Sequence, residues 1–217
     1  MKNLKKYKYI LFDLDGTISQ SAEGIRWSLE KTLEKFGVSG VDLSDYTRYI
    51  GPPLKDTLLN LCGFTEEMCD EGYEVYKNYY AEQGKLMNKP YDGIADVLAE
   101  LKQRGYKLAV CTSKLEQTAE IVIKELGLDA YFDKICGSNR DSTRKDKKDL
   151  IPYAAESLGG TLAESVMLGD TWYDAKGAFL CGVDFVACSY GYGDDEMMKK
   201  YNPVAWAASP LDILKLF

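Results

Sequence analysis

The sequence predicts an α/β protein: a doubly wound, Rossmann-like parallel sheet with an inserted α-helical domain. One observation behind this prediction is that short apolar runs alternate with helix-like segments through most of the chain. The other is that residues 20 to about 86 carry helical patterns only. Ligands of parallel sheets bind at the carboxyl ends of the strands, so we expect the functional residues there.

The core is expected to contain strands in five apolar runs: 7–12, 106–111, 134–136, 165–168 and 183–188. Apolar residues recur at helical spacing between 94 and 101, with Asp92 as the expected N-cap and Gly105 just past the end. Two more helices are expected, within 115–127 and 149–159. The second should begin close to Pro152, because proline is tolerated only near the first turn of a helix.

The insertion is expected to be a small helical domain. Its first helix shows an apolar stripe closed by Gly37: Ile25, Leu29, Leu33 and Phe36. The sequence "GPPL" (51–54) breaks the chain before two further helical segments. Four tyrosines of the last segment follow helical spacing, which favours packing over a binding site: Tyr73, Tyr76, Tyr79 and Tyr80. We predict a helical cap at 19–86 and a core made of 1–18 and 87–217.

Composition excludes several classes of function. The chain has 217 residues and a formal net charge of −7, which argues against binding to a nucleic-acid polymer. It has no histidine, so it cannot hold a serine triad, a Cys–His pair or a histidine base. The six cysteines include no C-x-x-C pair and are expected to be reduced, mostly buried thiols. The apolar run after the Lys-rich start is too short for a signal peptide or a membrane span, so we expect a cytoplasmic protein that binds no membrane.

The first chemical motif is "YILFDLDGT", in which an apolar strand ends at two carboxylates. Asp13 and Asp15 should point to the same face of the strand and could reach one ligand. Gly16 then lets the backbone turn and expose its amides to an anion. Such a pair must be solvated or must bind a cation, because like charges repel and are costly to desolvate. The alternative is a surface turn capped by aspartates.

The second motif is "VMLGDTWYDAKGA" (166–178). Asp170 follows another apolar strand, and Asp174 lies one helical turn later. Asp13 and Asp170 could share one Mg²⁺, with Asp174 orienting the groups around the ion, because oxygen ligands suit this metal. Alternatively, Asp174 is only an acidic residue stabilised at a helix N-terminus.

Two further motifs could bind phosphate. In "LAVCTSKL" (108–115), Thr112 and Ser113 stand between a strand and a helix, where hydroxyls and amides suit an anion. Thr112 could instead be an ordinary N-cap. The densest basic run is "STRKDKKDL" (142–150), which alone could be a solvated turn.

The order of these four motifs resembles the haloacid dehalogenase superfamily, and the resemblance covers essentially the whole chain. The helical insertion directly after the first motif resembles a C1-type cap. The stretches "IGPPL" (50–54) and "SYGYG" (189–193) are similar to the phosphoglycolate-phosphatase-like branch.

The resemblance implies roles for these residues. Asp13 would be the nucleophile that forms an aspartyl phosphate, and Asp15 the general acid and base, with its backbone carbonyl on Mg²⁺. Thr112 would hold phosphoryl oxygens. A lysine would neutralise nucleophile and phosphate. The pattern "TRxxKxDLI" favours Lys147, while a register counted from the helix end selects Lys145, and Lys148 is a third candidate.

Substrate choice is expected to depend on the cap. Two prolines make "IGPPLKDT" rigid, so Gly51 and Leu54 are candidate substrate contacts. Lys55 and Lys114 could attract a second anionic group. The alternative is a plain interhelical turn.

The sequence therefore predicts a Mg²⁺-dependent phosphatase for a small phosphorylated metabolite such as phosphoglycolate or a nucleoside monophosphate. A sugar phosphomutase of the same superfamily is the enzymatic alternative. A phospho-aspartate receiver-like protein is the non-enzymatic one, although it would lack the cap and be much shorter.

Overall fold

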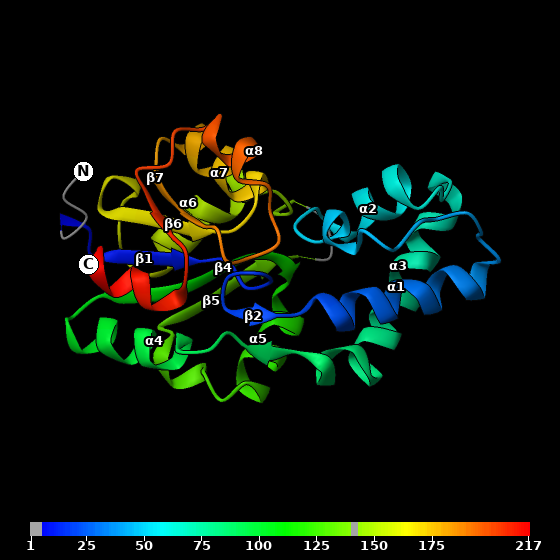
Figure 1. Ribbon diagram of the computed structural model, residues 1–217, viewed down its shortest axis with the longest axis horizontal. Helices are drawn as coiled ribbons and strands as arrows, with labels where there is room; N and C mark the ends of the chain where they lie inside the picture. The colour runs from blue at the N-terminus through cyan, green and yellow to red at the C-terminus, as the bar shows by residue number, and fades with distance from the viewer. Residues whose placement is uncertain (1–5, 140–142) are drawn as a thin grey trace.

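The structure, a computed structural model, describes residues 6–139 and 143–217 (Figure 1). Within these residues the core is a six-stranded parallel sheet of order β5-β4-β1-β6-β7-β8. The strands are β1 (Tyr9–Phe12), β4 (Lys107–Leu115), β5 (Lys134–Ser138), β6 (Ser165–Gly169), β7 (Asp184–Cys188) and β8 (Ala205–Ala207). All five predicted strands are confirmed. The sixth, β8, is too short to show an alternating pattern in the sequence.

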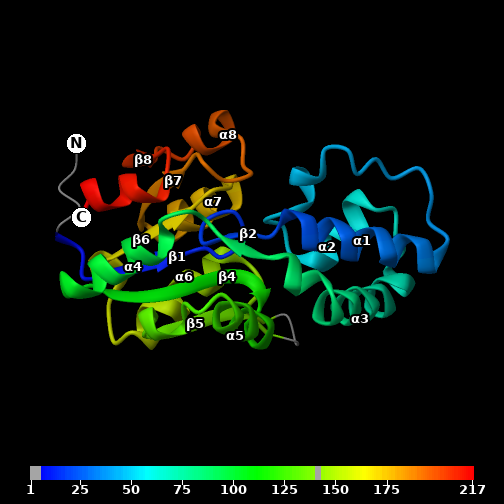
Figure 2. The ribbon, with the colours of Figure 1, turned by 60° about the horizontal axis from the view of Figure 1, so that its bottom comes forward.

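Helices cover both faces of the sheet, which confirms the doubly wound prediction (Figure 2). Ile10 and Phe12 of β1 pack in a cluster with α4, α5 and the 3₁₀-helix η6, whereas Leu11 packs on the other face with α6 and α7. The α-helices of the core are α4 (Ile94–Gln103), α5 (Glu116–Glu125), α6 (Lys147–Ser157), α7 (Trp172–Cys181) and α8 (Asp195–Lys199). Its 3₁₀-helices are η4 (Asp129–Tyr131), η5 (Leu162–Glu164) and η6 (Pro210–Lys215).

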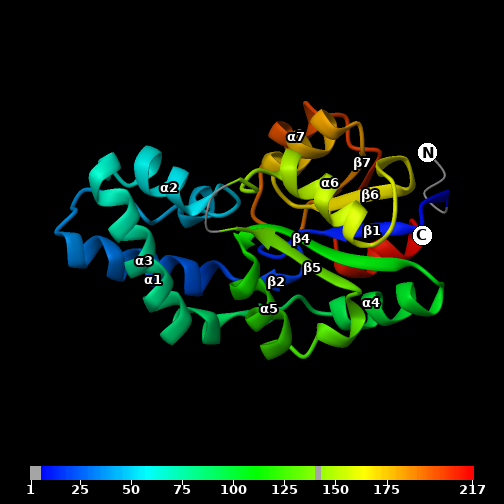
Figure 3. The same ribbon diagram turned by 180° about the vertical axis from the view of Figure 1, so that it is seen from behind.

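A helical insertion follows β1 and lies beside the sheet, beyond the carboxyl ends of its strands (Figures 1 and 3). It contains α1 (Ala22–Phe36), η2 (Tyr46–Tyr49), α2 (Leu54–Leu61), α3 (Glu66–Glu82) and η3 (Gly84–Met87). The chain enters through β2 (Ser19–Gln20) and returns through β3 (Lys89–Pro90), and these two short strands pair antiparallel. This pair is where we propose the boundary between core and cap, close to the predicted division.

Two details of the helix predictions were wrong. The N-cap of α4 is Gly93 and not Asp92. Helix α6 begins at Lys147, so Pro152 lies inside it rather than near its start. Proline cannot donate to the carbonyl four residues earlier, that of Lys148. The Cys181 thiol donates to this carbonyl at 3.4 Å, which helps the helix to tolerate the proline.

The six cysteines are free thiols, and all but Cys181 are buried, as predicted. Among the described residues, no helix has both the length and the apolar character needed to cross a membrane. The cytoplasmic location stays a prediction.

Candidate active site

Asp13 and Asp15 lie just beyond the carboxyl end of β1, in the middle of the sheet. The Asp13 N–H donates to the Leu168 carbonyl at 2.9 Å, which continues the pairing of β1 with β6. The Asp13 side chain is almost completely buried, whereas Asp15 is partly accessible, and both line one cavity. The two carboxylates therefore face a common space.

Asp170 follows β6 and lies against the turn after Asp15. Its carboxylate accepts hydrogen bonds from Thr17 Oγ1 at 2.9 Å and from the Tyr192 N–H at 2.8 Å. Gly16 has φ +87°, and a Cβ atom there would lie 2.1 Å from Asp170 Oδ2. Both the backbone conformation and the lack of space require glycine at this position.

The two carboxylate oxygens of Asp174 make different contacts at the site. Its Oδ2 accepts from the Thr171 N–H at 3.1 Å and from Thr171 Oγ1 at 2.8 Å, within the capping box that begins α7. Its Oδ1 lies 2.6 Å from Lys147 Nζ. The two interpretations of this residue, a helix-terminal acid and a member of the carboxylate cluster, are compatible.

The Lys147 side chain lies at the centre of the site, where it contacts Asp13 of the first motif and Asp174 of the second. Lys147 is the first residue of α6, and its Nζ lies 2.7 Å from Asp13 Oδ1 and donates to the Cys111 carbonyl at 2.7 Å. The side chain is only 4% exposed. Lys145 lines the cavity that contains Asp13, with its Nζ 3.4 Å from Asp56 of α2, whereas Lys147 and Lys148 both line a second cavity.

The electrostatics of this cluster favour an additional cation. Burial and the charge of Asp174 raise the pKa of Asp13 to about 7, although Lys147 acts in the opposite direction. Burial, Asp174 and Asp13 together raise the pKa of Asp170 well above its usual value. Burial by itself would lower the pKa of Lys147, but Asp13 and Asp174 raise it, so its ammonium stays charged. The Lys147 ammonium contacts Asp13 and Asp174, and one positive charge cannot balance the three carboxylates of the cluster.

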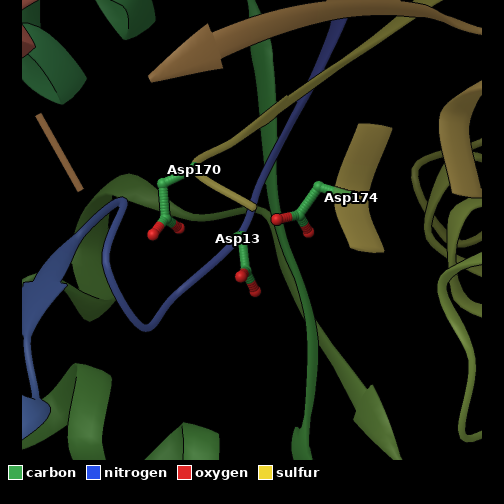
Figure 4. Close-up of side chains that lie close together, drawn as sticks. All are labelled: Asp13, Asp170 and Asp174. Atoms are coloured by element: carbon green, nitrogen blue, oxygen red, sulfur yellow. The ribbon is translucent and has the colours of Figure 1, made fainter. Parts of the chain in front are cut away.

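The donor set fits a divalent metal ion. Asp13, Asp170 and Asp174 are all buried, and each offers an oxygen within 4.8 Å of the others (Figure 4). Hard oxygen ligands of this kind are typical of Mg²⁺ sites. A divalent cation here would compensate the charge that Lys147 leaves.

The other predicted phosphate contacts lie at the carboxyl end of β4. Thr112 is buried, Ser113 is half-buried, and both line the cavity that contains Asp13. Lys114 Nζ lies 2.9 Å from Asp15 Oδ2 and donates to the Tyr80 hydroxyl at 3.2 Å. Burial by itself would lower the pKa of Lys114, but Asp15 raises it above its ordinary value.

A cavity of about 300 Å³ lies between the carboxyl ends of β1 and β4 and the helical insertion. Gly51 and Leu54, predicted as substrate contacts, both line it, and so does Lys55, which pairs with Asp70 at 2.6 Å. A Cβ atom on Gly51 would lie 3.0 Å from Thr171 Cγ2, so the loop approaches the core closely, as expected.

Some residues at the site were not predicted from the sequence. Tyr76 and Tyr80 are buried, as expected of packing residues, but with Tyr73 they also line the cavity. The packing interpretation was therefore incomplete. Helical spacing could place these rings on one face but could not show that this face meets Asp15.

The sequence matches the family described as haloacid dehalogenase-like hydrolase over residues 10–188. It is 34% identical to a 5'-nucleotidase of Pseudomonas aeruginosa over 203 residues, 94% of this chain and 92% of that one. It is also 34% identical to the tyrosine-protein kinase PtkA of Mycobacterium tuberculosis over 207 residues, 95% of this chain and 70% of that protein.

A phosphoglycolate phosphatase of Aquifex aeolicus is 31% identical over 209 residues, 96% of each chain. Among solved structures, a predicted phosphatase from Clostridium acetobutylicum superposes with a TM-score of 0.90 at 37% identity, covering 96% of this chain and 99% of that one.

Proposed function

This chain belongs to the haloacid dehalogenase-like hydrolases, and on that premise we propose that it is a Mg²⁺-dependent phosphatase of small phosphorylated metabolites. The observation that carries the proposal is the contact of Lys147 Nζ with Asp13 Oδ1 at 2.7 Å, beside a cavity large enough for a small substrate. A buried carboxylate held by an ammonium suits an attack on phosphorus, because phosphoryl transfer depends mainly on positioning and charge neutralisation.

Asp13, Asp170 and Asp174 are the side chains proposed to hold Mg²⁺, with Asp13 and Asp170 as direct ligands and Asp174 orienting the site. The Asp15 backbone carbonyl is proposed as a further ligand. When bound, the ion would neutralise phosphoryl charge. Every other task falls to residues of the chain.

In the proposed reaction, an Asp13 carboxylate oxygen attacks the phosphorus atom while the ester P–O bond breaks. Asp15 gives a proton to the leaving oxygen. Asp15 then takes a proton from a water molecule, which attacks phosphorus, releases inorganic phosphate and restores Asp13. Thr112 and Ser113 hold the phosphoryl oxygens, while Lys147 neutralises charge.

The substrate class is proposed from the cavity and from the relatives. Their names include a 5'-nucleotidase and a phosphoglycolate phosphatase, and both describe hydrolysis of small phosphate monoesters. A nucleoside monophosphate and phosphoglycolate are therefore the first substrates to test. Gly51 and Leu54 are proposed to contact the part of the substrate beyond the phosphate, since both line the cavity.

The test is release of inorganic phosphate from a panel of phosphorylated metabolites, with Mg²⁺ and with a chelator. We expect release only with Mg²⁺, and Asp13→Asn should keep the fold but lose turnover. Near-wild-type rates in that variant would exclude the aspartyl-phosphate route. Conversion of a sugar phosphate into an isomer without phosphate release would favour the phosphomutase instead.

A further inference from the structure

We infer that Tyr80, a residue of the helical insertion, is a positioning residue for Asp15 and acts through Lys114. The inference rests on the proposed function, in which Asp15 protonates the leaving oxygen. It adds a residue on α3 that does not touch the reacting atoms but determines where the proton donor lies.

A continuous polar chain connects the insertion to Asp15. The Asn88 Nδ2 group donates to the Tyr80 hydroxyl at 2.7 Å, and Lys114 Nζ donates to the same hydroxyl at 3.2 Å. Lys114 Nζ then lies 2.9 Å from Asp15 Oδ2. The ammonium also lies 4.4 Å from the centre of the Tyr80 ring, a distance suited to a cation–π contact.

Three side chains of this polar chain are largely buried, which limits the conformations that they can adopt. Tyr80 is only 3% exposed, and the side chains of Lys114 and Asp15 are 11% and 13% exposed. A lysine side chain in water samples many rotamers, but here the phenol and the carboxylate restrict its ammonium. Lys114 therefore transmits the position of Tyr80 to Asp15.

The pairing leaves one oxygen of Asp15 for chemistry. Oδ2 is held by Lys114, whereas Oδ1 is buried without a hydrogen-bond partner among the described residues. Asp15 lines the cavity that contains Asp13 and Thr112. Fixing Oδ2 limits rotation of the carboxyl group, so Oδ1 is the oxygen that can meet the leaving group of a substrate.

The test separates proton donation from every other step. Two flat substrates of similar size, p-nitrophenyl phosphate and phenyl phosphate, differ mainly in how much their leaving oxygen needs a proton. Because kcat/KM reports steps up to the first irreversible one, it is independent of later hydrolysis of the aspartyl phosphate. The ratio of the two kcat/KM values therefore measures help from the general acid.

Tyr80→Phe removes only the hydroxyl and keeps the ring that stacks on Tyr76. We expect kcat/KM for phenyl phosphate to fall about tenfold, the size of one hydrogen bond to a charged group, with a much smaller fall for p-nitrophenyl phosphate. Tyr79→Phe is the matched control on the same helix. Tyr79 is half-buried against Trp27 and outside the cavity lining, so the ratio should not change.

Lys114→Met gives an independent measurement if Tyr80→Phe folds poorly. It should change the ratio at least as much, and adding Tyr80→Phe to it should change the ratio no further, because both act through one contact. Equal losses on both esters, an unchanged ratio, or fully additive effects would overturn the inference while leaving the phosphatase intact. The proposed function itself fails only if the wild type releases phosphate from neither ester and from no metabolite of the panel, and the inference then falls with it.

Discussion

The ammonium of Lys147 lies between two buried carboxylates, 2.7 Å from Asp13 Oδ1 and 2.6 Å from Asp174 Oδ1. One of these carboxylates follows the first strand of the chain and the other lies in helix α7. The lysine therefore fixes the relative positions of the proposed nucleophile and of a proposed metal-site residue.

This arrangement leads to a prediction about the three neighbouring lysines. Lys147→Met should reduce kcat by at least about 10²-fold, comparable to removing one electrostatic donor from an active site. Lys145→Met and Lys148→Met are matched controls from the same segment and should retain most activity. Phosphate release under saturating substrate measures all three. A loss concentrated in Lys145→Met would mean that the catalytic lysine is two residues earlier.

A second prediction concerns pH and the metal-free protein. The folded protein holds the pKa of Asp13 at about 7, above the unfolded value of 3.8. Ionised Asp13 therefore destabilises the fold above pH 7, and this penalty is lost as the pH falls from about 7 towards 4. Asp170 shifts in the same direction. In a chelator, the protein should melt at a higher temperature at pH 6 than at pH 8.

Asp13→Asn tests the origin of this effect. It removes one ionisable carboxyl from the cluster, so at pH 8 without metal it should melt above the wild type, and the difference should shrink at pH 6. Mg²⁺ should stabilise the wild type more than the variant, because a ligand that binds only the folded state raises its stability. Thermal unfolding measures both. The same pH dependence in variant and wild type would show that Asp13 is not the source.

The carboxylates of this centre could be predicted from local sequence pattern, whereas the choice of its lysine rested on the resemblance to related phosphatases. Asp13 and Asp170 come directly after apolar strands, and parallel strands bring such ends together. The pattern "TRxxKxDLI" favoured Lys147 over Lys145, and the contact of Lys147 Nζ with Asp13 Oδ1 at 2.7 Å agrees with that choice.

The cavity wall could not be predicted in the same way. Tyr80 meets Lys114, and Asp56 meets Lys145, only because the insertion lies over the end of the sheet. No local periodicity encodes this docking. The start of α6 was missed for a related reason, since the partner of the Lys148 carbonyl is Cys181 on another helix.

A third prediction concerns the turn after Asp15. Gly16→Ala should destabilise the protein and weaken Mg²⁺ binding, because the new Cβ would overlap the Asp170 carboxylate, 2.1 Å away. Gly37→Ala is the matched control. Gly37 also has a positive φ, +63°, but nothing lies within 4 Å of its Cβ position. Backbone strain of about 1 kcal/mol is expected in both variants.

The two glycine variants are compared by thermal unfolding and by calorimetric titration of Mg²⁺. Only Gly16→Ala should change the affinity for the metal. If both variants bound Mg²⁺ as the wild type does, Asp170 would not be a ligand or the turn would adapt without moving it.

The final prediction concerns substrate choice by the loop before α2. Leu54 lines the cavity, so Leu54→Ala should remove contacts with the part of the substrate beyond the phosphate. Relative kcat/KM between a nucleoside monophosphate and phosphoglycolate should shift about tenfold, as expected for one lost apolar contact in a pocket. Rates on p-nitrophenyl phosphate should change much less.

Leu61→Ala is the control, because Leu61 lies at the other end of α2, is also half-buried, and is outside the cavity lining. Equal losses on every substrate in Leu54→Ala, or the same shift in Leu61→Ala, would mean that α2 supports the fold and that this loop does not select the substrate.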